Sequence, residues 1–234
     1  MILYHTKSYH IKVVKMIILI GGEKGGTGKT TLATNLSSLR ALVGRDVLLL
    51  DTDLQGSAAY WSQTRDEANI APRVACLQRF GKGLQVEIQD LTKRYDDIII
   101  DAGGRDSVEL RSSLVVAEYV FIPIQPSQFD VWTLQRMESL VIQAKGFNLD
   151  LKAFVVISRA STNPLVGEVQ EAQDVISDFP NLDLADTIIR DRIAYRKAAK
   201  EGLCVLELKP TDQRASNEIH FLYKEIFKET FYEK

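Results

Sequence analysis

The feature that most constrains this chain is a glycine-rich turn between an expected strand and an expected helix. An apolar run at 16–20 predicts a buried strand, and apolar residues fall at helical spacing from Leu32 onward. The turn between them reads Gly-Gly-Glu-Lys-Gly-Gly-Thr-Gly-Lys-Thr-Thr at 21–31. Glycines there let successive backbone N–H groups point at one anion, and the helix N-terminus adds partial positive charge. The segment therefore predicts a phosphate-binding loop rather than a simple helix cap.

The residues of this loop suggest a nucleotide and a metal ion. Lys29 can reach the β- and γ-phosphates, and the Thr30 hydroxyl can ligate Mg²⁺. The usual pattern G-x-x-x-x-G-K-[ST] does not fit, because its first glycine would fall on Glu23. The pattern present is K-G-G-x-G-K-[ST], with a second lysine, Lys24, at its front. The expected nucleotide-binding residues are Gly25, Gly26, Thr27, Gly28, Lys29, Thr30 and Thr31.

Two further apolar runs end in acidic residues. Residues 47–50 lead into Asp51 and Asp53, and residues 98–100 lead into Asp101. A run that is apolar at every position is typical of a parallel strand buried on both faces. Ligands of such sheets bind at the carboxyl ends of the strands, so the loop and the three aspartates should converge. Because Mg²⁺ prefers oxygen ligands, the convergence predicts a Mg-nucleotide site.

Strand and helix patterns alternate along the rest of the chain, which predicts an α/β fold with a doubly wound, mostly parallel sheet flanked by helices. We expect one domain at 16–234 and an N-terminal extension or tail at 1–15, or, less favoured, an edge strand at 11–14. The net charge of −2 excludes a protein coated in positive charge, and no apolar run approaches the length of a membrane span. Further helices are expected at 29–43, after 57, and at 85–95, 107–117, 127–145, 164–177 and 216–232, and further strands at 74–77, 119–124, 152–157 and 183–188.

Together these motifs resemble the ParA/MinD family of deviant Walker A ATPases, and most of all its short plasmid and chromosome partition members. Residues 24–31 resemble the family's Walker A motif, 47–57 its Walker A′ motif and 98–101 its Walker B strand. Leu54 stands where Walker A′ usually has proline, and 101–104 departs from the commoner endings D-x-P-P and D-G-A-G. The resemblance covers about 16–230 and implies a P-loop NTPase fold.

The resemblance implies ATP and Mg²⁺ as cofactors and a homodimer that closes when ATP binds. In that dimer Lys24 would reach across to the partner's phosphates, and Asp53 would serve the attacking water. Asp51 would support Mg²⁺ and the nucleotide switch, while Asp101 would hold the ion through a water. The catalytic set is then Lys24, Lys29 and Asp53, and the metal set is Thr30, Asp51 and Asp101.

A basic segment near the C-terminus is the expected DNA contact. It holds five basic and two acidic residues within 190–201, so it can bind phosphates without reading bases, although a solvated helix face would look the same. Short ParA proteins bind nonspecific DNA as ATP dimers, and a centromere-binding, ParB-like adaptor stimulates their hydrolysis. The resemblance therefore implies a cytoplasmic, nucleoid-associated ATPase for plasmid or DNA segregation. The expected DNA-binding residues are Arg190, Arg192, Arg196, Lys197 and Lys200.

Two alternatives remain open at this stage. One is a positioning ATPase of the same fold that acts on a protein or membrane-associated cargo. The other is a nucleotide-gated binding scaffold with negligible turnover. The final helix carries an apolar stripe that could anchor to a membrane surface, but its charges are balanced rather than basic, so we expect it to pack in the core. The stripe consists of Ile219, Leu222, Tyr223, Ile226 and Phe227.

Overall fold

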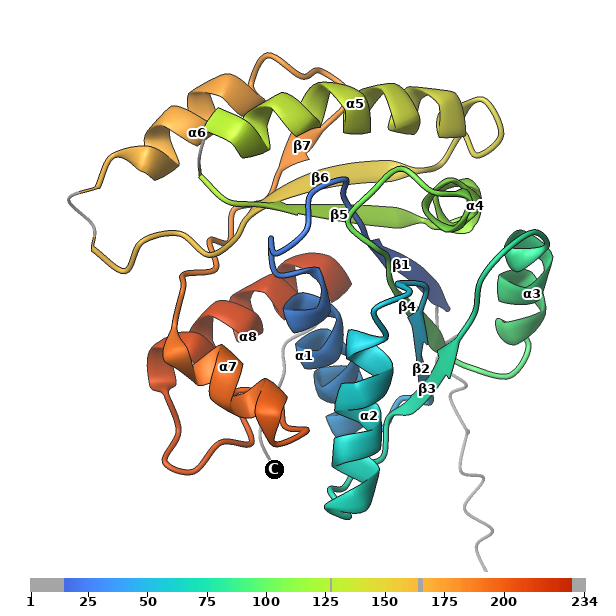
Figure 1. Ribbon diagram of the computed structural model, residues 1–234, viewed down its shortest axis with the longest axis vertical. Coiled ribbons are helices and arrows are strands. Elements are labelled where there is room, and N and C mark those ends of the chain that lie inside the picture. Colours follow the sequence, from blue (N-terminus) through green and yellow to red (C-terminus); the bar gives the residue numbers. More distant parts are fainter. Residues whose placement is uncertain (1–14, 127, 164–165, 229–234) are drawn as a thin grey trace, which may run out of the picture.

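A computed structural model describes residues 15–126, 128–163 and 166–228 (Figure 1). The expected N-terminal extension, except Lys15, and the alternative edge strand at 11–14 lie outside the described residues. Within the described residues the chain forms a seven-stranded sheet with helices on both faces.

Every strand pair in the sheet is parallel, and the strand order is β3-β2-β4-β1-β5-β6-β7. The chain starts at the centre, builds outward to β3, and then crosses back to build the other half. The doubly wound parallel sheet expected from the sequence is therefore confirmed. Its strands are β1 (Met16–Ile20), β2 (Val47–Asp51), β3 (Ala75–Gln78), β4 (Asp97–Asp101), β5 (Tyr119–Ile124), β6 (Lys152–Ile157) and β7 (Asp183–Leu184).

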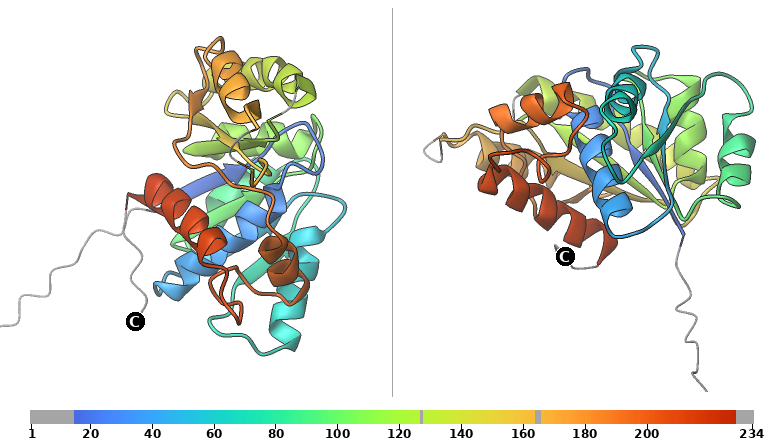
Figure 2. Two further views of the ribbon diagram at one scale, coloured as in Figure 1. Left: turned by 90° about the vertical axis from the view of Figure 1, so that its left-hand side faces the viewer. Right: turned by 90° about the horizontal axis from the view of Figure 1, so that it is seen from below.

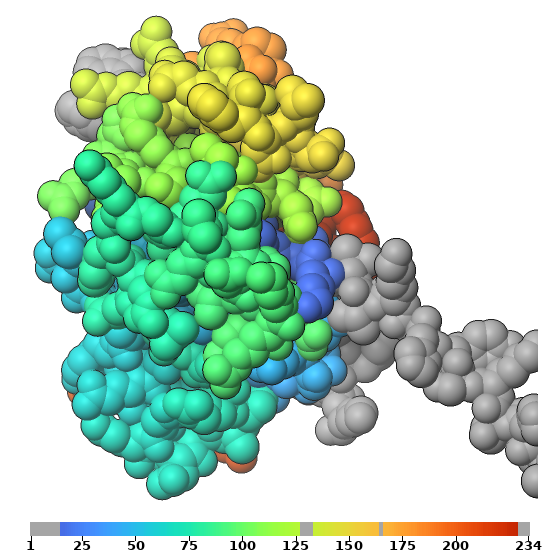
Figure 3. All heavy atoms as spheres, turned by 90° about the vertical axis from the view of Figure 1, so that its right-hand side faces the viewer, coloured from blue at the N-terminus to red at the C-terminus, as the bar shows by residue number. Residues whose placement is uncertain are grey.

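The helices form two layers, each with its own apolar cluster. One layer, which occupies the lower half of Figure 1, contains α1 (Lys29–Leu42), α2 (Ser57–Glu67), α7 (Ile193–Lys200) and α8 (Gln213–Phe227). The other contains α3 (Leu84–Leu91), α4 (Val108–Val116), α5 (Gln128–Lys145) and α6 (Glu168–Ile176). Figure 2 shows α8 lying against α1 on one side of the sheet, and Figure 3 shows the outer surface that includes α3 and α4.

The central strands are apolar at successive positions because each face of the sheet is covered. In β1, Ile18 and Ile20 pack in the α1 layer, whereas Ile17 and Leu19 pack in the α4 layer. Each fully buried aliphatic side chain of this kind stabilises the fold by about 1.5–3 kcal/mol. The run of apolar residues before the glycine-rich loop thus fixes that loop at the centre of the sheet's carboxyl edge.

Two elements begin or end elsewhere than the sequence predicts, because a side chain accepts the backbone hydrogen bonds at that point, from a distant helix in one case and from the adjacent residue in the other. The last strand was expected at 183–188 but ends at Leu184. Beyond it, the N–H groups of Asp186 and Thr187 donate to the Glu225 carboxylate of α8 instead of to a neighbouring strand. Likewise α8 begins before its expected start at 216, because Asp212 accepts the N–H groups of its first turn. Helices α3 and α6 are also shorter than expected, at Leu84–Leu91 and Glu168–Ile176.

The apolar stripe of α8 packs in the core, as expected from its balanced charges. Its five residues are at most 6% exposed. Tyr223 accepts a hydrogen bond from buried Arg40 of α1, and Arg40 is paired with Asp97 of β4. The C-terminal helix is therefore fastened to the centre of the fold. Among the described residues, none of the helices combines the length and apolar character needed to cross a bilayer.

Candidate functional site

The glycine-rich loop curls between β1 and α1 in a form that suits an anion. Gly26 and Gly28 have positive φ angles of 76° and 99°, a conformation that glycine adopts without steric cost. The Lys29 side chain is only 6% exposed, and its Nζ donates to the Lys24 carbonyl at 2.6 Å. Burial lowers the pKa of Lys29, against the opposing effect of Asp101 and Asp53. The lysine thus lies folded into the loop, where a phosphate would offer it a better partner than a neutral carbonyl.

Asp101, the last residue of β4, lies directly beside the loop. Its Oδ2 accepts a hydrogen bond from Thr30 Oγ1 at 2.7 Å, and the residue is 1% exposed. Its other carboxylate oxygen, Oδ1, is buried and has no hydrogen-bond partner among the described residues. Burial raises the pKa of Asp101 to about 7. A buried carboxylate oxygen without a partner is costly, so it marks a place where another group can bind.

That arrangement fits Mg²⁺ bound together with a nucleotide. Thr30 and Asp101 supply hard oxygen ligands, and the glycine-rich loop that ends at Thr30 supplies a phosphate position. In the described part of the chain, no group of three or more His, Cys, Asp or Glu residues could hold a metal ion alone. Mg²⁺ in nucleotide sites takes few protein oxygens and completes its shell with phosphates and waters, so a larger acidic cluster is not needed.

Asp51, which the sequence assigns to the metal set, ends β2 and is completely buried. Its Oδ1 accepts the Asp53 N–H at 3.0 Å and its Oδ2 accepts the Ala59 N–H at 2.9 Å. Burial raises its pKa, while these backbone donors oppose the rise. Asp51 therefore joins the turn after β2 to the first turn of α2.

Asp53 faces the same cavity as the phosphate loop. It is half-buried, and its Oδ1 accepts the Gln55 N–H at 3.1 Å, which closes a tight local turn. Leu54, which stands in place of the usual proline, is 64% exposed on this turn. The turn thus keeps the Asp53 carboxylate near the loop although the proline is absent.

The loop after β4 packs on the phosphate loop so closely that only glycine fits. A Cβ atom at Gly104 would lie 2.7 Å from the backbone nitrogen of Gly25 and 3.0 Å from the Lys24 carbonyl carbon. A Cβ at Gly103 would lie 3.4 Å from the Asp53 carboxylate. The unusual ending of the Walker B segment is thus a contact between three loops that together surround the site.

These loops open into a cavity of about 450 Å³ that continues from the phosphate loop to the start of α7. Arg159 lines this cavity and contacts the phosphate loop, because the Arg159 Nη1 donates to the Gly26 carbonyl at 2.6 Å. Sequence reasoning missed several lining residues, since only their position after parallel strands or beside the motifs marks them. They are Gln55, Ser57, Ser158, Arg159, Ile189 and Tyr195.

The basic segment expected to bind DNA divides into two parts. Arg190, Arg192 and Arg196 line the cavity. Arg192 is 14% exposed and pairs with Glu218 at 2.7 Å, and Arg196 pairs with Asp191 at 2.9 Å. Because Arg192 is held in this pair, it is less available for a phosphate backbone than the sequence suggests.

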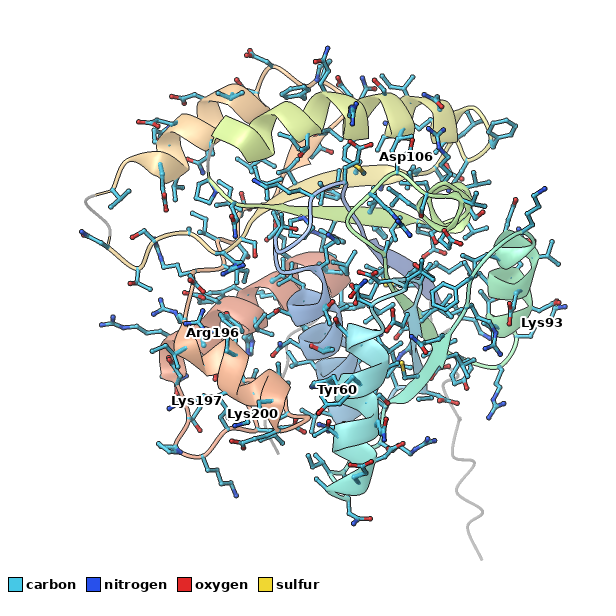
Figure 4. All side chains as sticks on the ribbon, in the orientation of Figure 1. Tyr60, Lys93, Asp106, Arg196, Lys197 and Lys200 are labelled. Carbon is cyan, nitrogen blue, oxygen red and sulfur yellow. The ribbon has the colours of Figure 1, made fainter. Side chains whose placement is uncertain are left out.

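The remaining basic residues lie on the outer surface. Lys197 and Lys200 are exposed on α7 and do not line the cavity. Figure 4 shows them beside Arg196, on the opposite side of the molecule from Lys93, which lies in the turn after α3. One helix therefore borders both the cavity and an exposed basic surface.

Comparisons with known proteins agree with this geometry. The family model described as "CobQ/CobB/MinD/ParA nucleotide binding domain" matches residues 18–205. The chain is 26% identical over 210 residues to the "Maintenance of carboxysome distribution protein A" of Halothiobacillus neapolitanus, covering 89% of this chain and 95% of that protein. It is 23% identical to the "Chromosome partitioning protein ParA" of Caulobacter vibrioides, covering 81% of this chain and 86% of the relative.

A solved structure supports the same fold. The septum site-determining protein MinD of Pyrococcus horikoshii, complexed with Mg-ADP, superposes with a TM-score of 0.68 at 21% identity. The match covers 92% of this chain and 96% of that one. At this level of identity the likeness establishes the fold.

Proposed function

The chain belongs to the CobQ/CobB/MinD/ParA nucleotide-binding domain family, and from this premise we propose that it is a Mg²⁺-dependent ATP hydrolase of the ParA type. The family expected from the motifs is thereby confirmed. The observation that best supports the proposal is the buried Asp101 Oδ1, which has no hydrogen-bond partner among the described residues. It lies beside Thr30 and a phosphate loop that contains two lysines. We propose a weak intrinsic activity, because Lys24, the residue that would act across a dimer, needs a second subunit.

Each proposed role follows from where the side chain lies. Thr30 and Asp101 would hold Mg²⁺, and Lys29 would leave the Lys24 carbonyl for the phosphates. Asp53 would orient the attacking water from its half-buried position on the cavity wall. Asp51 would support the metal site from behind, by fixing the backbone of Asp53. When bound, Mg²⁺ neutralises charge on the phosphate oxygens in transfer reactions of this kind.

Lys24 makes the strongest test of the dimer. Lys24→Ala should lower the stimulated rate of ATP hydrolysis by about 100-fold or more, because a cation supplied to the transferred phosphoryl group is worth that much. Nucleotide affinity should change only a few-fold, since Lys29 and the loop amides remain. The measurements are ATP turnover, ATP binding by calorimetry and dimerisation by light scattering. A variant that turned over ATP at the parent rate would refute the role across the dimer.

We further propose that the ATP dimer binds nonspecific DNA and drives plasmid or chromosome segregation with a ParB-like adaptor. A relative whose name describes chromosome partitioning supports this cargo, and the exposed lysines of α7 supply the charge. The protein would then work on the nucleoid in the cytoplasm. Contacts of this kind bind DNA phosphates through charge and release counterions.

The DNA surface can be tested apart from the cavity. Lys197→Glu with Lys200→Glu should weaken DNA retention in the presence of ATP and lower the slope of log affinity against log salt by about 2. Lys93→Glu is the matched control, because Lys93 is an exposed lysine in the turn after α3, far from α7 (Figure 4). If the parent and the double variant retained DNA equally, the proposal that α7 forms the DNA surface would be wrong.

A positioning ATPase is a second candidate, favoured by the carboxysome-distribution relative at 26% identity. It would share the nucleotide chemistry, the dimer and the DNA surface, and would differ in its cargo. The neighbouring reading frame separates the two. A small basic ribbon-helix-helix or helix-turn-helix protein would favour segregation, and a cargo-shell adaptor would favour positioning.

A further inference from the structure

We propose that Glu218 of α8 is a positioning residue for the nucleotide: it holds the cavity wall that receives the nucleoside, without lining the cavity itself. This inference rests on the proposed function, because it takes the cavity to bind a nucleotide. Glu218 would act at the end of the cavity that lies away from the phosphate loop. With the phosphates on the loop, the sugar and base must occupy the space that runs toward the start of α7.

The Glu218 carboxylate accepts hydrogen bonds from four donor groups that belong to three residues. Its Oε1 accepts both Nε and Nη2 of Arg192, at 2.8 and 2.7 Å. Its Oε2 accepts the Tyr195 hydroxyl at 3.0 Å and the Arg190 N–H at 3.2 Å. Arg190, Arg192 and Tyr195 all line the cavity, whereas Glu218 lies behind them. One carboxylate from a distant helix therefore holds three residues of the cavity wall in place.

These contacts are of the strong kind. Two N–H groups of Arg192 donate to the same oxygen of Glu218, and the pair is largely shielded, since the two side chains are 14% and 13% exposed. Charge-assisted hydrogen bonds of this type are about twice as strong as neutral ones. Burial raises the pKa of Tyr195, so its hydroxyl remains a donor to the carboxylate. Both oxygens of the Glu218 carboxylate are thus engaged in holding the cavity wall.

The anchor itself is rigid, and it is separate from the phosphate loop. One turn beyond Glu218, α8 buries Leu222 and Tyr223 completely, and Tyr223 is hydrogen-bonded to Arg40. The phosphate loop is shaped by its own glycines and by Gly104. The two ends of the cavity are therefore built by different parts of the chain. Loss of the Glu218 contacts should weaken binding of the nucleoside and leave binding of the phosphates unchanged.

The same helix offers a matched control. Glu225 also uses its carboxylate to hold a loop, by accepting the N–H groups of Asp186 at 2.7 Å and Thr187 at 3.1 Å. Neither of those residues lines the cavity. Glu225→Gln therefore removes a similar anchor from α8 without touching the proposed nucleoside wall.

The experiment measures binding of Mg-ATP and of inorganic tripolyphosphate by calorimetry to the full chain and its variants. Glu218→Gln should weaken Mg-ATP binding by about tenfold, equivalent to the loss of about one hydrogen bond to a charged group. Its affinity for tripolyphosphate should stay within about twofold of the parent. Glu225→Gln should change neither affinity. Arg192→Gln should weaken Mg-ATP binding as Glu218→Gln does, and the double variant should be no weaker than either single one, because the two residues act as one unit.

Three results would overturn the inference. They are an unchanged or tighter Mg-ATP affinity for Glu218→Gln, an equal weakening of tripolyphosphate, and an equal effect of Glu225→Gln. Thermal unfolding of each variant accompanies the titrations, and Glu218→Asp replaces Glu218→Gln if the latter does not fold. Faster amide hydrogen exchange at 190–196 in the Glu218 variant alone would support a loosened wall. Failure of the parent to bind Mg-ATP would instead refute the proposed function.

Discussion

Asp51 and Asp101 occupy equivalent positions but lie in opposite chemical situations. They are the last residues of adjacent parallel strands, they pair in register, and both are at most 1% exposed. Both carboxylic oxygens of Asp51 accept backbone N–H groups. Asp101 has one oxygen on Thr30 and another without a partner among the described residues. The same residue at the same place in a strand can thus be structural or available for a ligand.

The helix whose first turn lies beside each strand end explains the difference. Asp51 lies under the first turn of α2, whose Ala59 N–H is directed at it. Asp101 lies beside the first turn of α1, and there the donor is a side-chain hydroxyl rather than the backbone. The N–H groups that begin α1 are left for an anion, as at other phosphate-binding helix N-termini. The two aspartates therefore differ in role: Asp51 stabilises the fold, whereas Asp101 is placed to bind a ligand.

The largest expected effect comes from Asp101→Asn. Mg²⁺-dependent ATP hydrolysis should fall by about 100-fold or more, because the proposed metal site would lose its anionic ligand. The fold should remain intact, since asparagine matches the shape and no longer buries a charge. ATP turnover and the urea midpoint in the absence of nucleotide measure the two properties. Retained turnover would show that the available oxygen is not used in the reaction.

Asp51→Asn should have the opposite profile. It removes a hydrogen bond to backbone N–H and places an amide NH₂ against another donor, so the free energy of unfolding should fall by about 2 kcal/mol. For a chain of this size that corresponds to a melting temperature lower by about 4–8 °C. Turnover measured well below the melting temperature should change less than about tenfold. A variant that melted like the parent but lost turnover would show instead that Asp51 acts as a direct metal ligand.

The smallest effect is a pH dependence of stability in the protein without Mg²⁺ or nucleotide. The pKa of Asp101 is raised from 3.8 to about 7, so between these values the folded chain keeps a proton that the unfolded chain loses. Stability must therefore fall as pH rises through this window and become level above it. Between pH 6 and 8 the parent should lose about 1 kcal/mol relative to Asp101→Asn. Urea titrations at several pH values give the difference, and a constant difference would contradict the raised pKa.

The central part of the fold could be read from the sequence because its signals are local. Continuous apolar runs mark β1, β2 and β4, and the glycine-rich turn places a helix directly after β1. The prediction was less accurate at the edge of the sheet. There β7 ends just before Asp186 and Thr187, whose N–H groups donate to Glu225, a residue distant in the sequence. Sequence patterns predict the elements well where a residue's partners are its neighbours.

The sequence by itself determined the phosphate loop, the acidic strand ends and the family, because backbone shape and strand register follow from residues close in the chain. Only the tertiary structure decided which acidic side chain keeps a free oxygen and which is consumed by backbone donors. It also decided that Arg192 belongs to the cavity wall, since its partner Glu218 lies 26 residues away on another helix. The physical reason is that a side chain's role depends on which donors and charges surround it, and packing brings those together from distant segments.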